Sequence, residues 1–172
     1  MQVAAGLYNI VKELDKVRKL CQSLGLAITT AMLLAVPVAA QTTLQLQIDN
    51  PDMVLDGTAQ PIDEHGSAPI IKDGRTVVPL RPVIEALHGT VLWDDDLRLI
   101  TIRDYLGENE IILKINSHDS VVNARTGPQL DVTPMLINNV TKVPIQFVSY
   151  HLGINLEWED DTRTITLTSN TP

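Results

Sequence analysis

The chain has 172 residues, of which 21 are acidic and 13 are basic, and its formal net charge is −8. Proteins that bind nucleic acid need clustered Lys and Arg to neutralise phosphates, so this composition argues against a nucleic-acid partner and against passive adhesion to anionic lipid. The length suffices for one or two domains.

The first forty residues have the composition of an export signal. Basic residues come first, residues 24–36 (LGLAITTAMLLAV) carry no charge, and the small residues Val38 and Ala40 stand at positions −3 and −1 before Gln41. This order is typical of a secretory signal peptide. The apolar run is shorter than the roughly 20 residues that span a bilayer as a helix. We predict a signal peptide over residues 1–40 that is cleaved after Ala40, with an uncleaved N-terminal anchor as the alternative.

Export would make the chain a secreted or cell-surface protein, and no other segment is expected to enter a membrane. The single cysteine, Cys21, lies inside the predicted signal peptide, so residues 41–172 can form no internal disulfide. The stability of that part must come from its core.

Residues 41–104 form the first predicted unit. Three β-rich segments, TTLQLQI, DMVLD and APIIKDG, are bounded by Asp, Asn, Gly and Pro. A short helix follows, in which Leu80, Val83 and Leu87 recur at helical spacing and predict one apolar face. The His-Gly pair at 88–89 is expected to end it.

Residues 105–172 form the second predicted unit, on the same plan. The segments EIILKIN, DSVVNA and PMLINN are β-rich. Ile145, Val148 and Leu152 predict the apolar face of a second short helix, which Gly153 ends.

A β-hairpin is predicted after each helix. Val91 and Trp93 alternate toward one side of the first hairpin, as Leu156 and Trp158 do in the second. We expect this alternation to place both tryptophans in the core. The alternative is that their rings are exposed platforms on which a sugar could stack.

The two units are similar to each other in sequence. Residues 78–102 align without gaps on residues 143–167 at an offset of 65. Both tryptophans of the chain fall in this register. The sequence therefore predicts an α+β fold of two tandem β-β-β-α-β-β units, each a curled antiparallel sheet packed on one short helix. Because sixty-odd residues give only a marginal core, the units are expected to support each other.

Three acidic residues follow each tryptophan at the predicted hairpin tip. Asp favours turns because its carboxylate accepts backbone N–H bonds nearby, so we interpret both tips as solvated turns. Calcium binding is the alternative, although the tips lack the D-x-D-x-D-G spacing of an EF-type loop. The candidate calcium ligands are Asp94, Asp95, Asp96, Glu159, Asp160 and Asp161.

One known family shares this order of features. KDGRTVVPLRPVIEALHGTVLWDDDLRLITI, residues 72–102, resembles the repeat of the copper amine oxidase N-terminal-like domain, also called the stalk domain, and residues 137–167 resemble it more loosely. The usual form of that repeat is close to hNGRThVPLRhhhEhLGAxVxWDxxxxxhxI, where h is apolar. The second unit has Gln146 in place of Arg81, so no role of Arg81 can be carried over to it. The motif residues are Pro79, Arg81, Leu87, Trp93, Pro144, Leu152 and Trp158.

The resemblance implies an accessory domain of secreted or cell-surface bacterial proteins rather than an oxidase. Oxidase chemistry in that family belongs to a separate domain, which needs a quinone-forming tyrosine and three copper histidines. Tyr8, Tyr105 and Tyr150 lack the sequence context of such a tyrosine. The four histidines are scattered, with no H-x-H or H-x₃-H pair that would indicate zinc or copper.

We therefore predict a non-catalytic, exported binding or spacer module at the bacterial cell envelope, with no cofactor. The expected partner is a cell-wall component or another extracellular protein. The first alternative is a calcium-sensitive adhesion module that uses the acidic hairpin tips. A hydrolytic enzyme is less favoured, because the chain has no G-x-S-x-G motif, no phosphate-binding loop and no cysteine nucleophile in a recognisable setting.

Overall fold

The structure is a computed structural model that describes residues 41–170 of the chain. The predicted signal peptide and Cys21 lie outside these residues. Antiparallel strands dominate the described part and two short helices accompany them, which confirms the predicted α+β class. Within residues 41–170, neither helix has the length and apolarity needed to cross a membrane.

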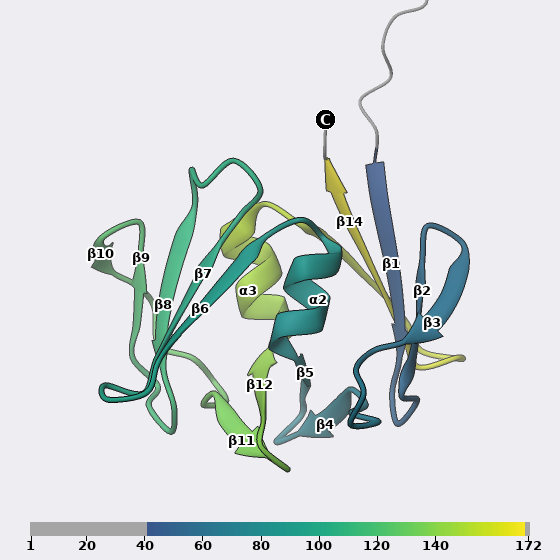
Figure 1. Cartoon of the computed structure of the whole chain (residues 1–172), viewed down its shortest axis with the longest axis horizontal. Coiled ribbons are helices and arrows are strands. Elements are labelled where there is room, and N and C mark those ends of the chain that lie inside the picture. The colour runs from purple at the N-terminus through teal and green to yellow at the C-terminus, as the bar shows by residue number, and fades with distance from the viewer. Residues whose placement is uncertain (1–40, 171–172) are drawn as a thin grey trace, which may run out of the picture. The chain divides into compact units, whose positions relative to one another are not determined.

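Alternating side chains direct the strands into three antiparallel sheets (Figure 1). Sheet 1 has the order β13-β14-β1-β2-β3, from Asn155–Glu159, Thr164–Asn170, Gln41–Gln47, Asp52–Leu55 and Thr58–Pro61. Sheet 2 has the order β10-β9-β8-β7-β6, from Arg125–Thr126, Ser120–Val122, Glu110–Lys114, Leu99–Arg103 and Thr90–Asp94. The bridging sheet has the order β11-β12-β5-β4, from Met135–Ile137, Val140–Pro144, Arg75–Pro79 and Ile70–Lys72.

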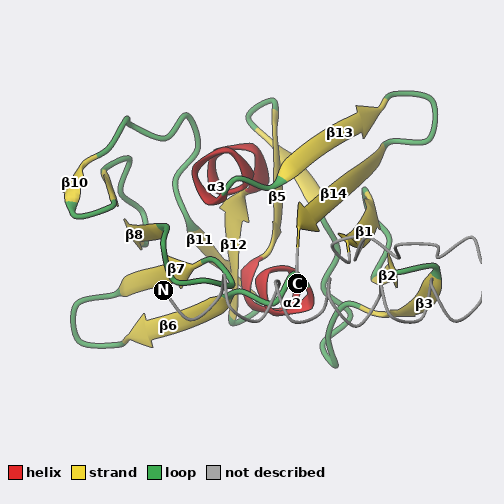
Figure 2. Cartoon of the chain, turned by 90° about the horizontal axis from the view of Figure 1, so that it is seen from above, coloured by secondary structure: helices red, strands yellow, loops and turns green. Residues whose placement is uncertain are grey.

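The helices α2 (Leu80–Ala86) and α3 (Ile145–Leu152) lie between sheets 1 and 2, as Figures 1 and 2 show from two directions. Each helix therefore has apolar contacts on two sides. Leu80 of α2 belongs to the core against sheet 2, whereas Val83 and Leu87 belong to the core against sheet 1. The single apolar face predicted for each helix is thus too narrow, because a helix held between two sheets must bury two stripes.

The sheets combine strands from both predicted units, which differs from the expected sheet for each unit. Sheet 1 joins β1–β3 of the first unit to β13–β14 of the second, and sheet 2 joins β8–β10 to β6–β7. The short connection 104–109 lets β8 pair directly with β7, and consecutive antiparallel strands commonly pair in this way. At the other end of the described chain, β1 pairs with β14, with Gln41 opposite Asn170.

The bridging sheet places corresponding positions of the two units opposite each other. β5 pairs with β12 so that Val78 lies opposite Val143, and these residues are 65 positions apart, the offset of the sequence alignment. Both side chains are completely buried. The two helices follow directly from these paired strands, at Pro79 and Pro144, which stand at the N-caps.

Both helices end as the sequence predicts, in a left-handed residue. Gly153 has φ 68° after α3, and the corresponding position after α2 is His88, with φ 63°. Gly89 is required for a different reason: a Cβ there would lie 2.7 Å from the carbonyl oxygen of Arg103 and 2.7 Å from Cγ2 of Ile84. The close passage of the α2 terminus over strand β7 therefore has no room for a side chain.

Replacing Gly89 by alanine should destabilise the fold by about 1–3 kcal/mol, because the backbone oxygen of Arg103 must move to admit the methyl group. The comparison variant is Gly153→Ala, which meets no atom within 4 Å and costs only the left-handed backbone conformation, about 1 kcal/mol. Urea unfolding of both variants measures the difference. Equal losses of stability would contradict the close approach.

Candidate binding groove

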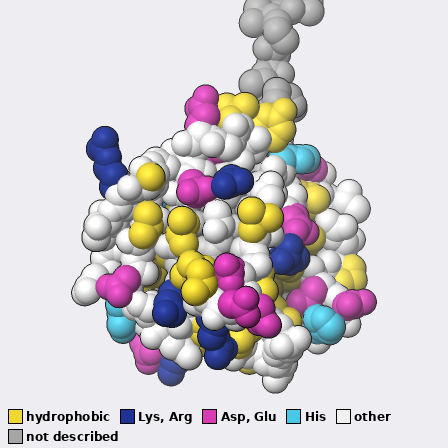
Figure 3. Space-filling model, turned by 60° about the vertical axis from the view of Figure 1, so that its left-hand side comes forward, with side chains coloured by type: hydrophobic (Ala, Val, Ile, Leu, Met, Phe, Trp, Pro, Cys, Tyr) yellow, Lys and Arg dark blue, Asp and Glu magenta, His cyan; other side chains and the backbone are white. Residues whose placement is uncertain are grey.

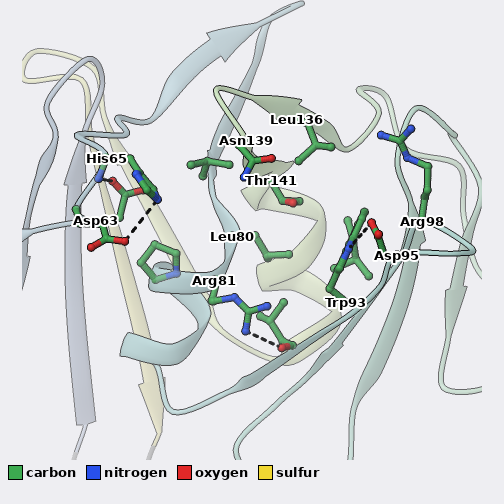
Figure 4. Close-up of a pocket in the computed structure, with 15 residues that line it drawn as sticks. Asp63, His65, Leu80, Arg81, Trp93, Asp95, Arg98, Leu136, Asn139 and Thr141 are labelled. Atoms are coloured by element: carbon green, nitrogen blue, oxygen red, sulfur yellow. Dashed lines mark hydrogen bonds and ion pairs between the residues drawn. The ribbon is translucent and has the colours of Figure 1, made fainter.

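A surface hollow lies between residues of the two predicted units. Four elements surround it: the start of α2, strand β6 with its hairpin turn, the β11–β12 turn, and the loop 62–69 that joins β3 to β4. Its volume is about 480 Å³. Figure 4 shows Trp93, Asp95 and Arg98 on one side, Asp63 and His65 on the other, and Arg81 between them. We call this hollow the Trp93 groove.

Trp93 is a wall of this groove and not a core residue, which corrects the sequence-based expectation. Its side chain is 37 % exposed, while Val91, two residues earlier on the same strand face, is buried. The reason is the length of α2. Seven helical residues extend about 10 Å, the length of about three strand residues, so α2 covers Val91 but its first turn does not extend over Trp93. The indole N–H of Trp93 donates to Oδ1 of Asp95 at 3.3 Å.

Trp158 stands at the equivalent place in the second unit and is 40 % exposed. Its indole N–H likewise donates to Oδ1 of Asp160. It lines a smaller hollow of about 330 Å³, the Trp158 groove, with Gly74, Arg75 and Gln146 among its other walls. The two tryptophan grooves thus share walls at positions that correspond at the offset of 65 residues.

The two grooves differ in their polar side chains. The Trp93 groove has Arg81 and Asn139 where the Trp158 groove has Gln146 and Gly74. Arg75 of the Trp158 groove is engaged elsewhere, since its Nε donates to Oδ2 of Asp131 at 2.8 Å. Only the Trp93 groove has a wall from the loop 62–69 that joins β3 to β4.

Arg81 forms an ion pair with Glu85, one helical turn later in α2, with 3.3 Å between Nη1 and Oε1. Both side chains are about half exposed, so this pair adds only about 0.3–0.5 kcal/mol to stability. The same Nη1 also donates to the carbonyl oxygen of Val91 at 3.1 Å. Arg81 therefore fastens α2 to edge strand β6 beside the groove.

The loop 62–69 is held by two groups that the sequence did not single out. Asp63 accepts the backbone N–H groups of His65 and Ser67 at 2.9 Å each. Burial raises the pKa of the Asp63 carboxyl, but the hydrogen bonds from Ser67 and His65 outweigh it, so the net pKa is lowered. The buried ammonium of Lys142 donates to the Ala68 carbonyl at 2.8 Å, and burial lowers its pKa despite the nearby Asp63 and Asp49 carboxylates.

The acidic hairpin tips have the turn contacts that the sequence predicts for Asp. Oδ1 of Asp94 accepts the N–H of Leu97 at 2.9 Å, and Asp95 and Asp160 accept the indole N–H groups. Asp96, Glu159 and Asp161 are exposed. In the described part of the chain, no three His, Cys, Asp or Glu side chains are grouped as a metal site requires.

The remaining motif residues are structural. Leu87 and Leu152 are 3 % and 6 % exposed, and Pro79 and Pro144 are buried where strands β5 and β12 lead directly into helices.

Figure 3, which looks toward the side of sheet 2, shows hydrophobic side chains at the surface among acidic and basic ones, without an extended basic strip on that face. Asn139 of the groove was not predicted as a site residue, because only the fold brings it near Trp93, and Arg98 was not singled out although it lies in the same predicted hairpin.

A family model for the copper amine oxidase N-terminal domain matches residues 62–167. The chain belongs to this family. The match includes both helices, both hairpins and the walls of both grooves, and it confirms the family resemblance inferred from the motif. No curated protein matches the chain. The matched family describes an N-terminal domain and supports a stalk-like module.

Proposed function

We propose that the protein is a non-catalytic, exported binding or spacer module of the bacterial cell envelope, built from two tandem units. The observation that carries this proposal is the placement of the motif residue Trp93, 37 % exposed, in the wall of a surface groove. A large aromatic side chain that is exposed in a concave site favours contact with a ligand over a role in packing alone.

The chemistry of the grooves supports binding rather than catalysis. Two of the carboxylates that line the Trp93 groove already accept hydrogen bonds: Asp63 from its own loop and Asp95 from the indole. Hydrolysis by an acid–base pair would instead need carboxylates that are available to the substrate. Export is supported by the charged leader, the apolar segment 24–36 and the small residues before Gln41.

Expression of the full chain in a Gram-positive bacterium, followed by cell fractionation, tests this function. We expect the protein in the wall fraction or on the cell surface, with a mass that corresponds to a start at Gln41. Wall-associated protein that is released only by a calcium chelator would instead favour the calcium-sensitive adhesion module. Full-length protein confined to the cytoplasm would contradict the proposal.

The control variant is Ala40→Arg, which places a large charged residue at position −1 of the predicted cleavage site. It should leave export to the membrane intact but prevent cleavage, so that the product keeps the mass of the whole chain. An unchanged product would show that the cleavage site is wrong without bearing on envelope binding.

A further inference from the structure

We infer that the Trp93 groove binds a neutral oligosaccharide, with the face of the Trp93 ring as the platform on which a sugar ring stacks. This inference rests on the proposed function and names the ligand class of its binding site.

The first observation is that Trp93 is held in a defined orientation. Its indole N–H is engaged by Asp95, so the exposed part of the residue that borders the groove is the apolar ring. Asp95 lies in the tight turn between β6 and β7, directly after the strand that carries Trp93. A ring that is fixed before the ligand arrives loses little conformational entropy on binding, which favours affinity.

The second observation is that polar groups without a protein partner surround this ring. Among the described residues, the side chains of Asn139 and Arg98 and the hydroxyl of Thr141 make no hydrogen bond or ion pair with the protein, and all three line the groove. Asn139 and Thr141 can each donate and accept, and Arg98 donates. Sugar hydroxyl groups also donate and accept, so this set matches a polyol.

The third observation is the balance of charge. The groove has two arginines against three carboxylates, with His65 in addition. Asp63 and Asp95 are hydrogen-bonded within the protein, Arg81 is paired with Glu85, and Glu64 lies 3.8 Å from His65. A strongly anionic ligand would meet carboxylates and a cationic one would meet arginines, so a neutral ligand has the lowest electrostatic cost.

A peptide is the main competitor, and the structure disfavours its usual mode of binding. A peptide that extends a sheet pairs with the free backbone groups of an edge strand. On edge strand β6 the carbonyl of Val91 already accepts a hydrogen bond from Arg81, so an added strand would compete with the Arg81 guanidinium there. Recognition in this groove therefore depends on side chains and on the ring.

The Trp158 groove provides an internal control. It has a tryptophan of nearly equal exposure with the same indole-to-aspartate bond, but it has Gly74 in place of Asn139 and no wall from the loop 62–69. Binding should thus depend on Trp93 much more than on Trp158.

The test is titration of the protein purified from the expressing bacterium with cellotetraose and chitotetraose as neutral probes and tetragalacturonate as the acidic probe, followed by tryptophan fluorescence and calorimetry. We expect at least one neutral probe to bind, with tetragalacturonate at least tenfold weaker. Trp93→Ala should reduce the affinity at least tenfold and Asn139→Ala about threefold or more, while Trp158→Ala should change it less than twofold. Circular dichroism confirms that each variant is folded.

Failure of both neutral probes to bind would overturn the inference, as would equal losses from Trp93→Ala and Trp158→Ala. If the chain is nevertheless retained in the wall fraction, the proposed function stands and the groove takes a different ligand, such as a protein. Preferential binding of tetragalacturonate would overturn the neutral class of ligand.

Discussion

Residues 41–104 and 105–172, produced separately, will not fold as monomers, whereas an equimolar mixture will form a folded complex. The reason is the composition of the sheets. In the first fragment β7 lacks its partner β8 and β1 lacks its partner β14. In the second fragment β8 and β14 lack β7 and β1 in turn. The hairpin β6–β7 would be left without a sheet, and isolated two-stranded hairpins are at best marginally stable in water.

The cores explain why this effect should be large. In the core against sheet 1, residues of β1 pack with Ile165 and Leu167 of β14 and Ile145 of α3. The core against sheet 2 combines Ile100 and Ile102 of β7 with Ile111 and Leu113 of β8. Separation exposes both cores at once, and a fragment of about 65 residues has little other apolar surface to bury.

Circular dichroism will measure the folded state of each fragment, and light scattering after size-exclusion chromatography will measure its association state. Each fragment alone should show the spectrum of an unfolded chain, or associate with itself when concentrated, because β7 and β14 occupy corresponding positions and β1 could pair with either. The mixture should elute as a one-to-one complex that unfolds cooperatively. A monomeric fragment with a cooperative unfolding transition would contradict the prediction and show that each unit can close its own sheet.

Leu46→Ala should destabilise the protein by about 2–5 kcal/mol and lower its melting temperature by about 10 °C. Leu46 is 1 % exposed and lies in β1, the central strand of sheet 1, opposite Met53 on one side and Ile165 on the other. Truncation removes apolar contacts from the core and leaves a cavity that the sheet cannot close without moving its neighbours.

The matched control is Gln45→Ala, one residue earlier in the same strand on the opposite face, where the side chain is exposed. It should change stability by less than about 0.5 kcal/mol. Urea unfolding of both variants gives the comparison. Similar losses for the two would show that β1 does not present the face seen in the structure, and a small loss for both would mean that β1 is dispensable.

The position of β1 also bears on export. Cleavage behind Ala40 would leave Gln41 as the new N-terminus and would keep every described residue of β1, Gln41–Gln47. Cleavage a few residues later would remove part of this strand, the central strand of sheet 1.

Local patterns in the sequence determined the secondary structure and the turns. The alternation of Leu44 and Leu46 with glutamines predicts strand β1, the spacing of Val148 and Leu152 predicts helix α3, and Gly153 predicts its end. The turn role of Asp94 also follows from its own chemistry. Each of these features depends on residues that are close together in the chain, so no knowledge of the fold was needed.

Only the tertiary structure decided which strands pair and where the tryptophans lie. The choice of β14 over β7 as the partner of β1 joins segments more than 100 residues apart, and either pairing satisfies the same alternation of side chains. The exposure of Trp93 depends on how far α2 extends along β6, which the period of the strand does not reveal. The groove beside it needs Asn139 and the loop 62–69, and these reach Trp93 only after the sheets have assembled.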